Sequence, residues 1–158
     1  FQHDTLLVGP MRLQLEVELQ QDACLFAGIR KFQGEREVVF EGSYGFGYDL
    51  VSRGFLRASH RQLDESRTTS YRPYHTHTQR LPVVAGQSLG LDLEMLPSAT
   101  HFAAGDQLRL DLQGSYFFAR HPLWGQFPAG YEVSPPGRCR VLRCRLLLPQ
   151  LPALQTFP

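Results

Sequence analysis

Apolar and polar residues alternate one by one along three segments of the chain, at residues 12–19, 89–95 and 108–112. Successive side chains of a β-strand point to opposite faces, so this alternation predicts three strands that each bury one face. The first segment shows the pattern without interruption, and its inward face would carry Leu13, Leu15, Val17 and Leu19.

Four further segments are rich in Val, Phe, Leu or Ile and are bounded by turn-forming residues, as is typical of shorter strands. They are residues 23–32, 36–41, 51–58 and 139–148. A short helix or a turn is expected at residues 62–67, and no long segment follows the helical period. Many short strands separated by turns predict an all-β fold, an antiparallel jelly-roll β-sandwich, with a closed barrel as the alternative.

Two long stretches, residues 59–82 and 115–137, follow neither period. Long irregular connections in compact domains are usually functional or packed against other structure. The second stretch is rich in aromatic residues, including Tyr116, Trp124 and Tyr131. Such rings stack on sugars, but several of the others are Phe, which lacks a polar group for sugar recognition, so packing is the favoured interpretation.

The composition indicates a single globular domain and excludes several classes of partner. The chain has 158 residues, of which 42% are hydrophobic, enough to bury a core. Its net charge of +1 gives no broad electrostatic surface for nucleic acid or an anionic membrane. No run approaches the roughly 20 apolar residues of a membrane-spanning helix, and no export signal is visible, so we expect a cytoplasmic protein.

The chain has three cysteines, Cys24, Cys139 and Cys144, without the spacing of a metal-binding motif. We therefore expect thiols in a reducing compartment. Cys139 and Cys144 are five positions apart, so on one regular strand they would point to opposite faces and would not form a disulfide with each other.

Residues 86–90 read Gly-Gln-Ser-Leu-Gly and match the G-x-S-x-G pattern of a nucleophile elbow. The elbow requires a helix after the serine, so that the hydroxyl is exposed on a strained turn. Here an alternating strand follows Ser88, and residues 83–86 are expected to form the turn before it. We therefore predict no nucleophile at Ser88.

Ser59, His60 and Asp64 have the residue types of a catalytic triad. Adjacent residues on an extended chain point in opposite directions, so Ser59 and His60 are not expected to form a nucleophile–base pair. We expect Ser59 and Asp64 to shape a turn, and Arg57 and Arg61 to bind carboxylates or carbonyl groups. No catalytic residue is predicted.

His75 and His77 would present their imidazoles on one side of an extended segment. This arrangement suits a metal ion in cupin-type jelly rolls, but residues 78–81 supply no acidic third ligand and include a cation. The favoured interpretation is a loop whose histidines form local hydrogen bonds or face a partner. No metal or cofactor is predicted, and a metal-dependent enzyme using these histidines is kept as a third hypothesis.

Three segments occur in an order and spacing that resemble a known family. They are residues 54–61 (GFLRASHR), 73–77 (PYHTH) and 97–110 (PSATHFAAGDQLRL). The series resembles the C-terminal, non-catalytic domain of the X-Pro dipeptidyl-peptidase and cocaine-esterase-like (CocE/NonD) serine hydrolases.

The resemblance implies one accessory domain over residues 1–158, with a core at about residues 7–149 and a fold similar to galactose-binding domains. The catalytic α/β-hydrolase domain of such enzymes is absent from this chain. The resemblance further implies that the domain packs on that catalytic domain and shapes its cleft or a contact between identical subunits. The chain alone would not be catalytic, whereas its parent would hydrolyse esters, amides or X-Pro peptides.

A second hypothesis is an autonomous module that binds carbohydrate or another small ligand. Glycan binding lost on substitution of Trp124 would favour it, whereas an apolar patch that matches a hydrolase surface would favour the accessory domain. The candidate contacts for a partner or ligand are Tyr74, His75, His77, Tyr116, Trp124 and Tyr131.

Overall fold

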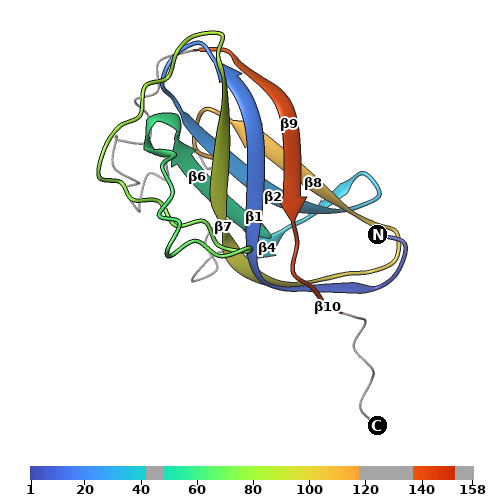
Figure 1. Cartoon of the computed structure of the whole chain (residues 1–158). Helices are drawn as coiled ribbons and strands as arrows, with labels where there is room; N and C mark the ends of the chain where they lie inside the picture. The colour runs from blue at the N-terminus through green and yellow to red at the C-terminus, as the bar shows by residue number, and fades with distance from the viewer. Residues whose placement is uncertain (42–47, 118–136, 152–158) are drawn as a thin grey trace, which may run out of the picture.

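The computed structural model describes residues 1–41, 48–117 and 137–151, without the side chains of Glu41 and Tyr48. These residues form antiparallel strands and one short 3-10 helix, η2 (Ala58–His60) (Figure 1). The strands are β1 (Thr5–Leu19), β2 (Cys24–Gln33), β3 (Arg36–Val38), β4 (Phe40–Glu41), β5 (Tyr48–Asp49), β6 (Ser52–Arg57), β7 (Ser88–Phe102), β8 (Asp106–Gln113), β9 (Cys139–Leu147) and β10 (Gln150–Leu151). The predicted all-β class is confirmed.

The long strands form two sheets that face each other. In sheet A, β1 lies in the centre with β7 along one side and β9 and β10 along the other. In sheet B, β2 lies in the centre with β8 along one side and β6 and β3 along the other. No strand of one sheet pairs with a strand of the other in the described residues, so the fold is a sandwich and the barrel alternative is wrong.

The core fills the space between the two sheets. The alternating positions of β1 point inward as predicted, and Leu13 and Val17 have no exposed surface. Sheet B contributes Ala27 and Ile29, which are also fully buried, from the opposite side. The period of two in the sequence therefore translates directly into one buried face per sheet.

Strand β7 is longer than the alternation predicts, because a bulge lets it continue past Pro97. Residues 96 and 97 lie opposite the single residue Pro10 of β1, where the register shifts. Two residues against one is the definition of a β-bulge, and proline, which has no N–H group, is tolerated there. After the bulge Thr100 and Phe102 point into the core.

The two sheets approach closely at one edge and separate at the other. β6 crosses β7 closely, and the Ser52 hydroxyl donates a hydrogen bond of 2.6 Å to the Leu96 carbonyl. At the opposite edge, the backbones of β8 and β9 do not approach each other as β6 and β7 do in the described residues. Residues that face inward along β9 are therefore exposed, including Val141 at 43%.

The long connection from β6 to β7 is irregular, as predicted for residues 59–82. Its one isolated bridge pairs Leu63 with His75, and residues 65–67 form a turn and not a helix. Of residues 115–137, only the two ends are described. None of the described helices is long and apolar enough to cross a membrane.

Candidate functional site

The carboxylate of Asp22 joins the turn after β1 to the end of β6. It accepts a hydrogen bond of 2.7 Å from Nε of Arg57, and two of 2.9 Å from the backbone N–H and the hydroxyl of Ser59. Ser59 is buried and its hydroxyl donates to a carboxylate, so it has a structural role. The roles predicted for Arg57 and Ser59 are confirmed, whereas their partner Asp22 was not anticipated.

The hydrogen bonds to Asp22 change its protonation. Burial alone would raise the pKa of Asp22, but the hydrogen bonds from Arg57 and Ser59 favour the charged form and lower the pKa below its ordinary value. Asp22 therefore stays ionised and binds the end of β6 as a carboxylate.

Arg61 holds the two ends of the long connection together. Its guanidinium donates to the carbonyls of Ala58 (3.1 Å) and Pro82 (2.9 Å). Asp64 caps a tight turn by accepting from the backbone N–H and the hydroxyl of Ser66. Both residues have the structural roles that the sequence predicted.

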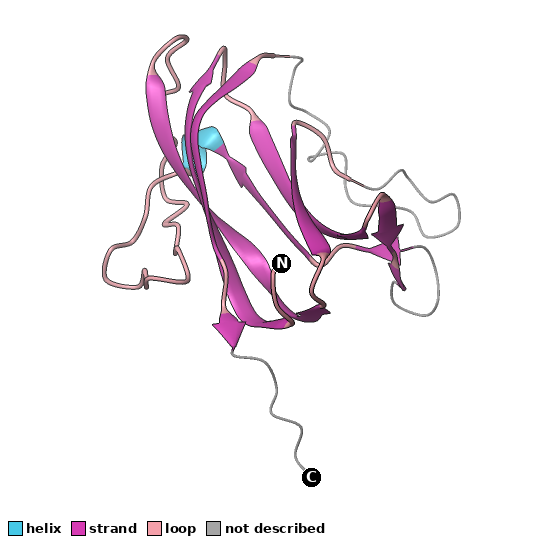
Figure 2. Ribbon diagram, turned by 90° about the vertical axis from the view of Figure 1, so that its right-hand side faces the viewer, coloured by secondary structure: helices cyan, strands magenta, loops and turns pink. Residues whose placement is uncertain are grey.

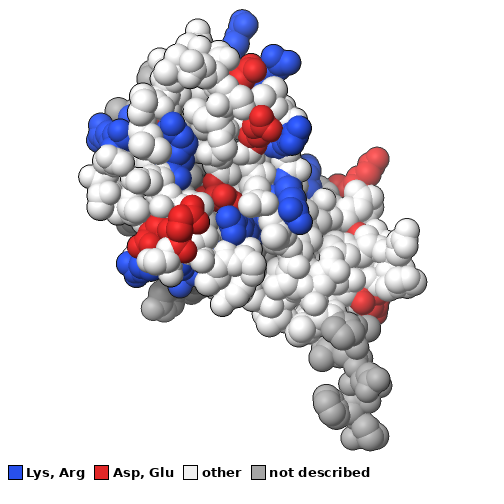
Figure 3. Space-filling model, in the orientation of Figure 1, with Lys and Arg blue, Asp and Glu red and all other residues white. Residues whose placement is uncertain are grey.

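The long connection is also attached to the outer face of sheet A (Figure 2). Arg12 of β1 pairs with Asp92 of β7 at 2.7 Å and donates to the carbonyl of Thr69 in the connection. Arg72 of the connection pairs with Glu94 of β7 at 2.6 Å. Basic and acidic side chains are interspersed over this face (Figure 3), so the outer face of sheet A is charged but close to neutral locally.

Three histidines gather in the connection, and we call His60, His75 and His77 the histidine cluster. The ring centroids of His60 and His77 lie 5.4 Å apart, and those of His75 and His77 lie 5.8 Å apart. The Nδ1 atoms of His60 and His77 are 3.3 Å apart. His75 and His77 were predicted site residues, whereas His60 was considered only beside Ser59.

The side chain of His75 is partly buried, whereas that of His77 is exposed. The Nε2 atom of His75 is buried and has no hydrogen-bond partner among the described residues. Burial, followed by the neighbouring His77, lowers the pKa of His75, so its neutral form is favoured. Its other contact is a backbone hydrogen bond with Asp92 of β7.

Tyr74 is occupied by contacts within the connection. The guanidinium carbon of Arg67 lies 3.4 Å from the centroid of the Tyr74 ring, a cation–π contact. The Tyr74 carbonyl accepts from the Asp64 N–H at 2.7 Å. The preceding Pro73 is fully buried. These contacts pack Tyr74 within the connection.

Ser88 does not have the geometry of a nucleophile elbow. It is the first residue of β7, and its hydroxyl donates to the carboxylate of Glu16 at 2.9 Å. The turn before it contains Gly86 with a φ of +76° and a hydrogen bond from Gln87 to Val84. The predicted turn is confirmed, and no helix follows the serine.

Tyr116 packs on the outer face of sheet B. Its ring meets Phe26 of β2 edge to face, with centroids 6.0 Å apart. Phe26 also lies 5.9 Å from Phe55 of β6. Phe117 occupies the space above Gly28, where an added Cβ would lie 2.7 Å from the Phe117 ring. Tyr116 therefore packs on sheet B, and the candidate residues Trp124 and Tyr131 lie outside the described residues.

The segment of residues 97–110 forms the end of β7, a tight turn and the start of β8. Gly105 in the turn has a φ of +93°, which suits glycine. The carboxylate of Asp106 accepts from the Ala103 N–H at 2.8 Å and pairs with the buried Lys31 at 2.8 Å. Hydrogen bonding to Lys31 lowers the pKa of Asp106. The segment therefore connects the turn to the centre of sheet B.

A cavity of about 400 Å³ opens between the sheets at the β8–β9 edge. Its apolar lining comes from both sheets, with Leu19 and Val141 from sheet A and Leu25 and Leu112 from sheet B. Together with the exposed Val141, this cavity gives the β8–β9 edge, which we call the open edge, apolar surface that is available to a partner.

Strand β9 contains a second irregularity that affects its cysteines. The register with β1 shifts between Glu16 and Val17, so that Cys139 pairs with Leu19 and Cys144 with Leu15. Both partners point into the core, and both cysteines lie on the inner face of sheet A. Strand β9 is therefore not regular between the two cysteines, so the prediction that they point to opposite faces, which assumed a regular strand, does not hold. All three cysteines remain thiols.

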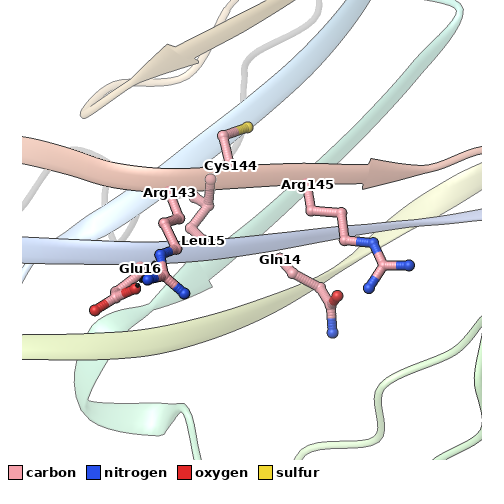
Figure 4. Close-up of a pocket in the computed structure, with 6 residues that line it drawn as sticks. All are labelled: Gln14, Leu15, Glu16, Arg143, Cys144 and Arg145. Carbon is pink, nitrogen blue, oxygen red and sulfur yellow. Dashed lines mark ion pairs between the residues drawn. The ribbon is translucent and has the colours of Figure 1, made fainter.

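A depression of about 490 Å³ lies across β1 and β9 (Figure 4). Arg143 and Glu16 form an ion pair of 3.4 Å on its outer side, and Arg145 lies on the same side. Cys144 points to the other side of the sheet. The depression has charged side chains but no arrangement of nucleophile and base.

The described residues thus form an all-β sandwich in which the side chains of Arg57, Ser59 and Arg61 connect strand ends and turns. The family model of the X-Pro dipeptidyl-peptidase C-terminal non-catalytic domain matches residues 1–122. The chain therefore belongs to this family of C-terminal non-catalytic domains.

Two solved structures of a CocE/NonD family hydrolase from Staphylococcus aureus are similar to the chain. They superpose with TM-scores of 0.86 and 0.83 at 28% and 29% sequence identity. Each match covers 96% of this chain and 29% of the hydrolase chain. The chain therefore spans less than a third of these relatives. No curated protein sequence matches the chain.

Proposed function

We propose that the chain is the C-terminal accessory domain of an α/β-hydrolase-type serine hydrolase and packs on the catalytic domain of that enzyme. The observation that carries the proposal is the family match, combined with relatives in which the similar part is 29% of the chain. The parent would be an X-Pro dipeptidyl-peptidase or an ester or amide hydrolase. The domain would shape its cleft or a contact between subunits.

The open edge between β8 and β9 is the surface that we assign to the catalytic domain. It combines a cavity of about 400 Å³ with exposed apolar side chains, including Val141 and Leu142 of β9. Apolar surface at a sandwich edge is stabilised when a partner covers it. The opposite edge is closed by the contact of β6 with β7 and offers no such opening.

The absence of catalysis by the chain alone is tested with activated substrates. The purified chain should not hydrolyse p-nitrophenyl esters or Xaa-Pro anilides, because Ser88 begins a strand and does not stand on the strand–turn–helix of a nucleophile elbow. Turnover by the wild type that disappears in the Ser88→Ala variant would contradict this proposal.

Packing is tested by expressing the catalytic part of the parent hydrolase separately and measuring its binding to this chain. Val141→Glu places a charge on the open edge and should weaken binding at least tenfold. Val84→Glu is the matched control, since Val84 is similarly exposed, at 48% against 43%, but lies in the turn before β7. Equal binding by the wild type and both variants would exclude the open edge as the contact surface.

A further inference from the structure

Strand β9 lies at the edge of sheet A (Figure 1). Its residues pair with β1 along one side of the strand. Along the other side, the described part of the chain supplies neither a strand nor a backbone hydrogen bond. An unpaired strand edge presents a row of N–H and C=O groups that can pair with an extended segment of another chain. The free edge of β9 is therefore a place where a further strand can be added.

Residues 139–145 of β9 are exposed on both faces of the sheet. The inner face of a strand in a sandwich is normally buried against the opposite sheet. This is so for Leu15 and Val17 of β1, which are 4% and 0% exposed, but not for Val141, the β9 residue that pairs with Val17. The side chains of an added strand would lie beside these inner positions of β9 and cover part of their surface.

The outer face of the same strand is basic. Residues 137–151 contain four arginines and no acidic residue. Arg143 and Arg145 lie on the outer side of the sheet, and Cys144 points to the other side (Figure 4). Arg143 meets Glu16 at 3.4 Å with its side chain 86% exposed, and such an exposed pair is weak. Arg145 forms no ion pair with a described residue, so both guanidinium groups are available to carboxylates of a partner.

A second copy of the chain fits this edge poorly. If two β9 strands paired antiparallel about a twofold axis at Cys144, Arg143 of one copy would lie opposite Arg145 of the other. With the axis at Arg145, identical arginines would face each other. Like charges directly opposite each other on paired strands are destabilising. The charge of β9 therefore disfavours pairing with itself and favours an acidic partner.

We propose that residues 143–147 of β9 bind an extended peptide segment with an acidic side chain at every second position, which adds to sheet A as a further strand. These residues pair with β1 without a register shift, and their number is a usual strand length. Acidic side chains lie opposite Arg143 and Arg145 on the outer face, and apolar ones lie beside Cys144 and Leu146 on the inner face. The inference rests on the proposed function only for the source of the segment, the catalytic domain.

The probe is a peptide of alternating Glu and Val, about nine residues long, titrated into the full chain at low salt and followed by calorimetry. One control peptide has the same composition with Glu and Val in two separate blocks, and another alternates Lys and Val. The Glu–Val peptide should bind at least tenfold more tightly than either control. In its complex, amides of residues 143–147 that exchange rapidly in the free chain should exchange at least tenfold more slowly, because they now donate to the added strand.

Charge reversal tests the role of the arginines. Arg145→Glu should weaken binding of the Glu–Val peptide at least tenfold and strengthen binding of the Lys–Val peptide. Arg36→Glu is the matched control and should bind as the wild type does, because Arg36 is exposed on β3, at an edge of sheet B. Circular dichroism of both variants should match that of the wild type, so that a change in binding reports the charge and not the fold.

Binding of the Glu–Val peptide no tighter than that of the controls, or unchanged exchange of residues 143–147 in its complex, would overturn the proposal. If the catalytic part of the parent hydrolase binds without slowing these amides, strand addition is also overturned while the proposed function stands. If the chain binds the peptide as expected but does not bind the catalytic part, the proposed function fails and strand addition stands.

Discussion

Gly54 is the residue at which β6 crosses the backbone of β7. A Cβ at this position would overlap the carbonyl oxygen of Glu94 and lie 2.8 Å from the sulfur of Met95. Because the nearest atom belongs to the backbone, it can move only if the strands separate. We expect Gly54→Ala to lower the free energy of unfolding by about 2 kcal/mol or more, measured by urea denaturation.

Gly90 provides the matched control for Gly54. It lies in β7, and a Cβ there would meet no atom within 4 Å. Gly90→Ala should therefore change the free energy of unfolding by no more than about 0.5 kcal/mol. Equal stability of the two variants would show that β6 and β7 do not approach as closely as described.

At the residue scale, the sequence predicted roles better than partners. Turn formation by Ser59 and pairing of Arg57 follow from residue type, because small hydroxyl residues favour turns and arginine favours carboxylates. The partner, Asp22, lies 35 positions before Arg57 in the chain. Such a contact depends on how the β1–β2 turn meets the end of β6, and no local pattern contains that information.

At the element scale, the hydrogen bonds of Asp22 connect three strand ends and should make the fold sensitive to acid. The folded-state pKa of Asp22 lies below its ordinary value of 3.8. At pH values between these two pKa values, the folded state therefore binds fewer protons than the unfolded state. The contribution to stability is therefore fully present above about pH 4 and is lost as the pH falls through the folded-state pKa.

The Asp22→Asn variant tests this contribution. At pH 7 it should lower the free energy of unfolding by about 1–2 kcal/mol, a modest value because Arg57 is one-third exposed. Below pH 4 the variant should lose stability less steeply than the wild type. Glu65→Gln, at an exposed position, is the control and should follow the wild type. If the free energies of unfolding of Asp22→Asn and the wild type fell in parallel with decreasing pH, this acid sensitivity would not come from Asp22.

Strands were predicted well where alternation is uninterrupted, and less well where a bulge occurs. The bulge at Pro97 reverses which positions of β7 face the core, so a single period of two could not describe the whole strand. The shift beside Val17 likewise places Cys139 and Cys144 on one face.

The contact between His60 and His77 was not predicted from the sequence. It depends on how residues near His60 pair with residues near His77 within the long connection, and not on the spacing within either segment.

At the scale of the whole molecule, the open edge leads to a prediction about cysteine reactivity. Cys139 and Cys144 lie on β9 and are exposed, whereas Cys24 is only partly exposed. Partial burial of the two β9 thiols raises the pKa of each, which slows labelling, so the reaction is run at mildly alkaline pH, where access of the reagent decides the rates. In the isolated chain, N-ethylmaleimide should modify Cys139 and Cys144 several-fold faster than Cys24, as measured by mass spectrometry.

Binding of the catalytic domain should change this pattern selectively. If the domain covers the β8–β9 edge, modification of Cys139 and Cys144 should slow at least tenfold in the complex, because reagent must then wait for dissociation. Cys139→Ser and Cys144→Ser variants assign each rate to its thiol. Unchanged rates in a complex that is demonstrably formed would place the contact on another surface, such as the charged outer face of sheet A, while leaving membership of the family intact.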